Sequence, residues 1–281
     1  MESVGIVVDS GSNFTPEEVK EYDFGWIPLH IVYPDGKTIL DTPDLDPQSI
    51  YDDIATGKLT TSQPSPDTME SVLRQMLERY SNVVYFTLSS AFSGTYRTAK
   101  MVVNQMKEKD RIKVIDTRQM ATGIDVFVMA VKRCMDSGRC TFESVEEYAS
   151  SLWGKAQIVF LLETLEHLER SGRISKVKSV IGSLLRIMPI FYVDEEGYIN
   201  TIDKVRGSIK KGLRALEKII DSHRMRSDIQ PRILIGRPKS SQILAFSEYL
   251  KEKLEAKVLY IRPTTAVHTG IWGIAVSFVD E

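Results

Sequence analysis

Short apolar runs alternate with stretches of helical periodicity along the first half of the chain. Runs rich in β-branched and aromatic residues cover residues 4–8, 27–33, 82–87 and 111–116, and they predict buried strands. Apolar residues recur at helical spacing near residues 46–56, 66–80, 95–108 and 118–137. Because strands and helices alternate, we expect this half to form an α/β domain with a mostly parallel sheet.

The second half repeats this pattern with one difference. Strands are predicted at residues 157–162, 232–236, 257–261 and 273–279, and helices near 207–226 and 240–254. Two further apolar runs, 188–193 and 198–205, flank the turn sequence Asp194-Glu195-Glu196-Gly197 and predict an antiparallel hairpin. We therefore expect two α/β domains, residues 1–155 and 156–281, the first with a mostly parallel sheet and the second with a mixed sheet.

Two weaker signals lie between the predicted strands of the second domain. A short helix that carries Leu165 and Leu168 is expected to end at Gly172, because glycine favours the left-handed conformation of a C-cap. The apolar stretch 180–190 fits either an ordinary core segment or the wall of a tunnel.

Two hydroxyl-rich segments are candidate binding loops, because hydroxyls and free backbone N–H groups at helix starts bind small anions. They are Thr60-Thr61-Ser62-Gln63-Pro64-Ser65-Pro66-Asp67 and Ser89-Ser90-Ala91-Phe92-Ser93-Gly94-Thr95. Each precedes a predicted helix, with Ser65 as the N-cap of the first. Neither carries Lys or Arg before Arg97, so a carboxylate fits better than a phosphate. The alternative that these hydroxyls only cap helices stays open.

Composition narrows the classes of partner. The net charge of −2 and the dispersed Lys and Arg residues argue against nucleic acid as the main partner. Cys134 and Cys140 have no nearby pair of histidines, so we expect neither a zinc site nor a disulfide framework, and the reducing cytoplasm as compartment. We find no signal peptide, no apolar run long enough to cross a bilayer, no metal-ligand spacing and no phosphate-binding glycine motif, and therefore expect no cofactor.

Several short motifs occur in the order typical of one family. They are Val7-Val8-Asp9-Ser10, Thr61-Ser62-Gln63-Pro64-Ser65, Leu88-Ser89-Ser90 followed by Ser93-Gly94-Thr95-Tyr96, Val114-Ile115-Asp116-Thr117, Leu168-Glu169-Arg170-Ser171-Gly172-Arg173-Ile174-Ser175, and His268-Thr269-Gly270. By these motifs, which span nearly the whole chain, the sequence resembles the DegV family.

The resemblance implies a carrier of a long-chain fatty acid and not an enzyme. DegV-like proteins hold the acyl chain in an apolar tunnel between two α/β domains, with the carboxylate held by hydroxyls. By that likeness Thr61, Ser62 and Ser93 would bind the carboxylate, with Gly94, Thr95 and His268 beside them. Members of the family present the fatty acid to a separate fatty acid kinase, which makes an acyl-phosphate for phospholipid synthesis.

The resemblance also points to a partner surface and contains two departures. Arg170 and Arg173 bracket the Ser-Gly turn of the family motif, and they are our candidates for contact with the kinase. Trp272 follows His268-Thr269-Gly270 where a Pro-Gly-rich turn is usual, so we expect it to reshape the pocket mouth or narrow the choice of lipid. Phe92 stands where leucine is more familiar.

Two rival functions stay open at this stage. Ser93 and His268, with Asp9 or Asp116, fit the residue types of a hydrolase or acyltransferase triad, although the sequence around Ser93 lacks the G-x-S-x-G pattern. A small phosphorylated metabolite is the other candidate ligand. Asp9 also has a local alternative, because its side chain is suited to capping its own turn at Ser10 and Gly11.

Overall fold

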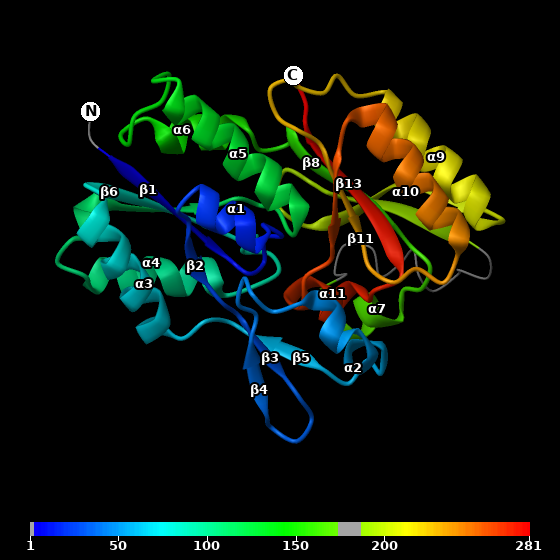
Figure 1. The fold of residues 1–281 in the computed structure, drawn as a ribbon, viewed down its shortest axis with the longest axis horizontal. Helices are drawn as coiled ribbons and strands as arrows, with labels where there is room; N and C mark the ends of the chain where they lie inside the picture. The colour runs from blue at the N-terminus through cyan, green and yellow to red at the C-terminus, as the bar shows by residue number, and fades with distance from the viewer. Residues whose placement is uncertain (1–2, 174–186) are drawn as a thin grey trace.

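The first sheet is parallel throughout, as expected from the buried apolar runs (Figure 1). The computed structural model describes residues 3–173 and 187–281. The strand order of this sheet is β2-β1-β6-β7. Its strands are β1 (Val4–Asp9), β2 (Gly25–Ile27), β6 (Asn82–Thr87) and β7 (Ile112–Asp116). The loops that follow β1, β6 and β7 therefore meet at one edge of the sheet, where open α/β sheets bind ligands.

Helices cover both faces of this sheet. On one face lie α3 (Pro66–Arg79) and α4 (Thr95–Gln105), which share a core cluster with β1, β6 and β7. On the other lie α1 (Pro16–Glu21), α5 (Thr122–Asp136) and α6 (Val145–Ser151). Thr15 caps α1 through a capping box with Glu18, and Ser65 caps α3 as expected. The helix expected over 118–137 begins only at Thr122, and α6 was not predicted.

The second sheet is mixed and has the strand order β10-β9-β8-β13-β11-β12. Its strands are β8 (Ala156–Leu162), β9 (Ile187–Val193), β10 (Ile199–Arg206), β11 (Arg232–Ile235), β12 (Lys257–Tyr260) and β13 (Gly273–Val279). Within this second sheet, β11 and β12 form the one parallel pair among the described strands, and the other neighbouring strands are antiparallel. The β9–β10 hairpin is confirmed, and Gly197 in its turn has a φ of 89°.

The two faces of the second sheet differ in what covers them. One face carries α9 (Ile209–Asp221) and α10 (Ser241–Leu254). The other packs against α2 (Tyr51–Ala55), α7 (Glu166–Ser171) and α11 (Pro263–Thr269). Gly172 ends α7 with a φ of 71°, as predicted for a C-cap. The helix expected over 207–226 ends at Asp221, and residues 180–186 of the apolar stretch lie outside the described part.

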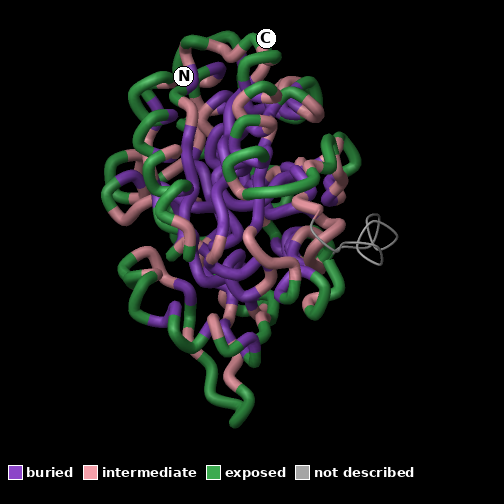
Figure 2. Tube along the Cα trace, turned by 90° about the vertical axis from the view of Figure 1, so that its right-hand side faces the viewer, coloured by how far each residue is buried: buried purple, intermediate pink, exposed green. Residues whose placement is uncertain are grey.

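A third, antiparallel sheet corrects two expectations. It has the order β4-β3-β5, with β3 (His30–Val32), β4 (Thr38–Leu40) and β5 (Thr60–Ser62). The strand expected over 27–33 is broken, because Pro28 has no N–H for a ladder and the Leu29 N–H donates to the Ser10 hydroxyl. Thr60–Ser62, expected as loop, is a strand. The β3–β4 hairpin projects from the rest of the molecule and is largely exposed (Figure 2).

The cysteine pair corrects a third expectation. Cys134 and Cys140 form a disulfide, and their Cα atoms lie 5.3 Å apart. Gly138, with a φ of 72°, turns the chain back after α5, and the Cys140 N–H donates to the Cys134 carbonyl at 3.2 Å. We expected a reducing compartment because we expected no disulfide framework. The Cys134–Cys140 disulfide removes that argument. In the described ranges, no helix has the length and apolar character needed to span a bilayer.

Helix α5 joins the two large sheets. It contacts β8, β11 and β13 of the second sheet and shares a core cluster with β1, β6 and β7 of the first. Ten of its residues are buried, so it is apolar on nearly every side. Where the chain divides into domains stays a prediction, since this helix belongs to the packing of both sheets.

A buried ion network ties this junction together. The Arg232 guanidinium donates to Glu18 at 2.8 Å and to Asp125 of α5 at 2.9 Å. All three side chains are less than one-tenth exposed. The Asp125 carboxylate also accepts the Asn13 N–H at 2.8 Å. The network therefore links strand β11, helix α1 and helix α5.

Replacing Arg232 tests the weight of this network. Arg232→Met would leave the Asp125 carboxylate buried without its cation, while Glu18 keeps Lys257 at 2.8 Å, and we expect a loss of about 3–5 kcal/mol in the free energy of unfolding. Urea denaturation monitored by circular dichroism measures it. The control is Arg74→Met, which removes exposed ion pairs to Glu70 and Glu108 and should change stability by less than about 1 kcal/mol. Equal effects of the two variants would contradict the account.

Candidate functional site

A polar cavity lies where the loops after β2, β6 and β7 face β5 and α11. Together with the open space at its mouth it measures about 770 Å³. Its polar side chains come from Thr61, Gln63, Ser93, Arg173, Thr264, Thr265 and His268, and its apolar wall from Leu29, Leu88, Phe92, Met120 and Ile199. Gly94 supplies backbone. Segments that are far apart in the sequence thus converge on one pocket.

An apolar cavity adjoins the polar one. Together with the open space at its edge it measures about 380 Å³, and it lies against the second sheet. The side chains that line it come mainly from β8, β11, β13 and the segment around α11, and include Ile158, Phe160, Leu162, Leu234, Ile261, Ile271, Ile274 and Ala275. Met120 and Thr265 line both cavities, so the two spaces lie side by side. A polar cavity thus adjoins an apolar one.

The tightest polar contact in the pocket joins two elements more than 200 residues apart. Thr61 Oγ1 lies 2.7 Å from His268 Nε2. The contact arises because β5 pairs with β3 and α11 packs on both strands. Nδ1 of His268 is buried and has no hydrogen-bond partner among the described residues. His268 can therefore either accept the Thr61 proton or donate to its oxygen.

Burial keeps His268 neutral. Loss of solvation, with a smaller effect of the nearby charges of Arg173 and His167, lowers its pKa to about 3. A neutral imidazole and a hydroxyl offer hydrogen bonds without a charge, so they orient an anion instead of neutralising it. The one basic side chain that lines the polar cavity among the described residues is Arg173.

The second hydroxyl loop supplies Ser93 on the wall formed by the loop after β6. Ser93 Oγ lies 2.8 Å from Thr95 Oγ1 and accepts the Thr95 N–H at 3.2 Å. Thr95 is fully buried and does not line the cavity, so it positions Ser93. Gly94 is the N-cap residue of α4, and a Cβ there would lie 2.6 Å from Gln63 Oε1. A side chain at position 94 would therefore obstruct the cavity.

Three residues singled out from the sequence lie outside both cavities. Ser62 is exposed, because alternate residues of strand β5 face opposite sides and Thr61 faces inward. Arg170 is exposed on α7, with its guanidinium against Gly57. Trp272 packs edge-on against His167, with Lys239 Nζ 4.2 Å from its ring centre, while its neighbours Ile271 and Gly273 line the apolar cavity. The expectation that Trp272 shapes the pocket mouth is not met.

Sequence reasoning missed the contribution of α11 beyond His268. Thr264 and Thr265 line the polar cavity from its first turn. The signal was present, since strand 257–260 is followed by Arg262-Pro263-Thr264-Thr265, the same succession of strand, proline and hydroxyls that marks the loop before α3. Arg173 was read as a partner contact and not as a cavity residue.

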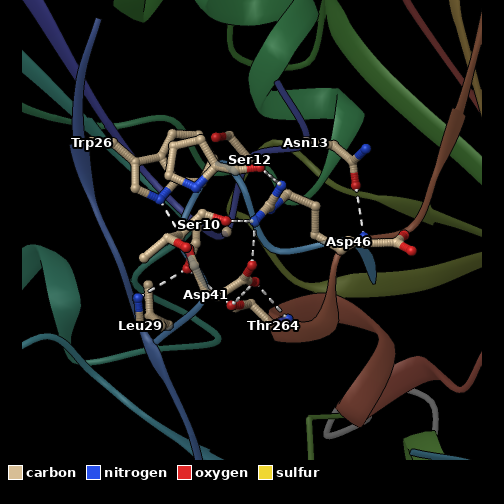
Figure 3. A network of polar contacts seen from close by, with 12 residues as sticks. Ser10, Ser12, Asn13, Trp26, Leu29, Asp41, Asp46 and Thr264 are labelled. Atoms are coloured by element: carbon tan, nitrogen blue, oxygen red, sulfur yellow. Dashed lines mark hydrogen bonds and ion pairs between the residues drawn. The ribbon is translucent and has the colours of Figure 1, made fainter. Parts of the chain in front are cut away.

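A network of polar side chains fixes the start of α11 (Figure 3). Figure 3 shows Ser10, Asp41 and Thr264 directed toward one another. The Asp41 carboxylate accepts the Thr264 N–H at 3.0 Å and the Thr264 hydroxyl at 2.7 Å. Because the Thr264 hydroxyl gives its proton to Asp41, the Ser10 hydroxyl donates to Thr264, at 2.9 Å, and it accepts the Leu29 N–H. Arg262 pairs with the other oxygen of Asp41.

The described hydrogen bonds do not form a catalytic triad. His268 bonds to Thr61 and not to Ser93. Asp9 accepts the N–H groups of Gly11 and Leu88 at 2.9 and 3.0 Å, and burial raises its pKa to about 7. It caps its own turn, as the local alternative predicted. Asp116 accepts the N–H groups of Ser90 and Arg118. No carboxylate therefore orients His268 as a triad requires.

Metal ligation has no support in the described ranges. There, no three His, Cys, Asp or Glu side chains are grouped so that they could hold a metal ion. The polar cavity instead presents hydroxyls, one amide, one neutral imidazole and one guanidinium. This set suits a singly charged oxyanion.

The pH dependence of stability tests the environment of His268. Because its folded pKa of about 3 lies below the value near 6.5 of an unfolded histidine, the unfolded chain takes up this proton first as the pH falls. The contribution is complete above pH 6.5 and is lost as the pH falls toward 3. We expect the free energy of unfolding of the wild type to fall more steeply than that of His268→Gln between pH 6 and 4, by up to about 1.4 kcal/mol per pH unit. Parallel curves from urea denaturation would contradict this.

Comparison with known proteins places this geometry in a family. The model of the DegV family, described as uncharacterised, matches residues 3–281. A DegV domain-containing protein of Clostridium perfringens is 31% identical over the full length of both chains. A solved DegV family protein of Thermus thermophilus, described by its fatty acid binding, is 25% identical with a TM-score of 0.83, covering 99% of this chain and 100% of its own.

A second solved structure has a named ligand. It is a stearic acid-binding protein of Eubacterium ventriosum, 25% identical with a TM-score of 0.81, and the match covers 98% of each chain. The family model and the full-length relative agree with the motifs in the sequence and with the two large sheets of the fold. The chain therefore belongs to the DegV family.

Proposed function

We propose that this protein binds a long-chain fatty acid, with the carboxylate in the polar cavity and the acyl chain in the apolar cavity. The observation that carries the proposal is that a polar cavity and an apolar cavity lie side by side and share Met120 and Thr265 in their linings. Adjacent polar and apolar spaces match the two ends of an amphipathic acid. The fatty-acid and stearic-acid binding of the two solved relatives supports the same ligand class.

The acyl chain supplies most of the affinity. Burying about fourteen methylenes contributes roughly 11 kcal/mol at about 0.8 kcal/mol each, before the costs of association and ordering. The polar cavity then has only to orient the carboxylate and to replace the hydrogen bonds that the carboxylate makes with water. Thr61 and Ser93 provide hydroxyl donors for that purpose, with neutral His268 beside Thr61.

The charge in the cavity favours a carboxylate over a phosphate. Arg173 contributes one positive charge, while a phosphate monoester carries about −1.5 to −2 near neutral pH. A small phosphorylated metabolite would also leave the apolar cavity unfilled. A hydrolase is the weaker candidate, because Ser93 bonds to Thr95 and not to a histidine.

The proposal extends to a partner by the family resemblance. We propose that the bound fatty acid is presented to a separate fatty acid kinase, that the product is an acyl-phosphate for phospholipid synthesis, and that this chain is a cytoplasmic carrier. Arg170 and Arg173 are exposed at the end of α7, and Arg173 also lines the polar cavity. This surface therefore adjoins the position proposed for the carboxylate.

Removing the two cavity hydroxyls tests the carboxylate site. For the double variant with Thr61→Ala and Ser93→Ala, we expect affinity for hexadecanoic acid to fall at least about 100-fold, since hydrogen bonds to a charged group contribute about 1.5–3 kcal/mol each. Displacement of a fluorescent fatty acid from delipidated protein measures it. Ser62→Ala removes the neighbouring exposed hydroxyl of the same strand and should change affinity by less than about 3-fold. Equal losses would contradict the assignment.

Charge reversal on α7 tests the partner surface. Arg170→Glu should lower acyl-phosphate formation with the kinase at least about 10-fold, because a reversed charge at an interface opposes docking. Fatty-acid affinity should be unchanged, since Arg170 lies outside both cavities. Lys218→Glu makes the same charge change on α9, which covers the opposite face of the second sheet, and serves as control. Parallel loss of phosphorylation in both variants would refute the assigned surface.

A further inference from the structure

The junction of the two cavities is formed by one pair of side chains. Among the described residues that line either cavity, only Met120 and Thr265 line both. Each is 8% exposed. We call this pair the neck. A ligand that occupies both cavities would lie against these two side chains.

An unusual backbone delivers Met120 to the neck. Arg118 has a φ of 53° and Ala121 a φ of 48°, although neither is glycine. Residues with a side chain adopt such conformations only under strain. Two of them within four residues mark a segment whose path is imposed by its surroundings, and Met120 lies between them.

Hydrogen bonds on both sides of Met120 hold this path. The Ser89 N–H donates to the Gln119 carbonyl at 2.9 Å, and the Ala121 N–H donates to the Gly11 carbonyl at 2.7 Å. The Gln119 side chain donates to the Ala156 carbonyl at 2.8 Å. The loops after β1 and β6 thus fix the backbone on either side of Met120.

The opposite wall of the neck is equally constrained. Thr265 lies in the first turn of α11, and its N–H donates to the Arg262 carbonyl at 3.2 Å. Its own carbonyl accepts the Thr269 hydroxyl at 3.2 Å. The neighbouring Thr264 is held by Asp41 and Ser10. The backbone at Met120 and at Thr265 cannot move away from the neck without breaking these hydrogen bonds.

We propose that Met120 and Thr265 determine specificity by admitting an unbranched acyl chain and rejecting a branch near the carboxyl group. The inference rests on the proposed fatty-acid binding. The hydroxyls of Thr61 and Ser93 line the polar cavity only, so the acyl chain would meet the neck on its way from the proposed carboxylate position to the apolar cavity. A branch near the carboxyl group would then press against these buried side chains, and added volume against a packed wall is unfavourable. A methyl branch at the far end lies beyond the neck and is not affected by it.

Isomeric acids measure this selectivity directly. The probes are 2-methyl-, 4-methyl- and 15-methylhexadecanoic acid, which have the same composition, with hexadecanoic acid as reference. Displacement of a fluorescent fatty acid from delipidated wild-type protein gives the four affinities. We expect the 2-methyl or the 4-methyl isomer to bind at least about 10-fold more weakly than hexadecanoic acid, the scale at which a pocket discriminates one methylene.

Three variants assign the selectivity to the neck. For Met120→Ala, we expect the loss of affinity caused by the carboxyl-proximal branch, relative to hexadecanoic acid, to shrink to less than about 3-fold. The affinity of the 15-methyl isomer relative to hexadecanoic acid should be unchanged. Thr265→Ser removes one methyl from the opposite wall and should shift the penalty in the same direction. Leu162→Ala is the matched control, because Leu162 lines only the apolar cavity and should leave the carboxyl-proximal penalty intact.

The outcomes separate the neck from the proposed function. Equal wild-type affinity for all four acids would overturn the neck while leaving fatty-acid binding in place. The same holds if neither neck variant relieves the penalty, or if Leu162→Ala relieves it as much as Met120→Ala. If Met120→Ala does not fold by circular dichroism, Thr265→Ser decides. No wild-type binding of hexadecanoic acid would overturn the proposed function, and the neck with it.

Discussion

The geometry of the site depends on one buried carboxylate, that of Asp41. Its two oxygens accept the Arg262 guanidinium and both donors of Thr264, and Asp41 itself is fully buried. A buried carboxylate is stable only when its hydrogen bonds are satisfied, so the first turn of α11 has little freedom to move. This turn carries Thr265, and His268 follows one helical turn later. The seven residues of α11 are too few to form a helix unaided, and the helix is therefore a product of these tertiary contacts.

This arrangement divides recognition between two kinds of surface. The polar cavity offers hydroxyls, a neutral imidazole and one guanidinium, which suit the orientation of the carboxylate proposed there. The adjoining cavity offers almost no polar atoms, so it suits an apolar chain. Because His268 stays neutral, its contribution to the cavity does not change across physiological pH. Orientation and affinity thus come from different segments, the loops and α11 on one side and the second sheet on the other.

Much of the fold was predictable because its signals are local. The buried runs of β1, β6 and β7 and the periodicity of α3 gave the parallel sheet, and the turn at Gly197 gave the hairpin. Strand β5 was not predictable, because it forms by pairing with β3, which lies far from it in the sequence. The disulfide was not predictable either, because it depends on the reversal of the chain at Gly138. In the site, the hydroxyl loops were found from helix starts. The pairing of Thr61 with His268 spans 207 positions and came only from the family resemblance. Ser62 was misplaced because the alternation of a strand separates it from Thr61.

The same packing that builds the site restricts how it can open. Helix α5 is buried between the two large sheets, and Asp125 on it pairs with Arg232 of β11. Domains move freely against each other when their interface is small and polar, whereas this one is a continuous apolar cluster with a buried ion network. Met120 and Ala121 immediately precede α5, so rotating the sheets apart would break the bonds at Gln119 and Ala121 that hold the neck. The structure therefore opposes a hinge motion of one large sheet against the other, and exchange of the proposed ligand would require local movement of the side chains and loops around the two cavities.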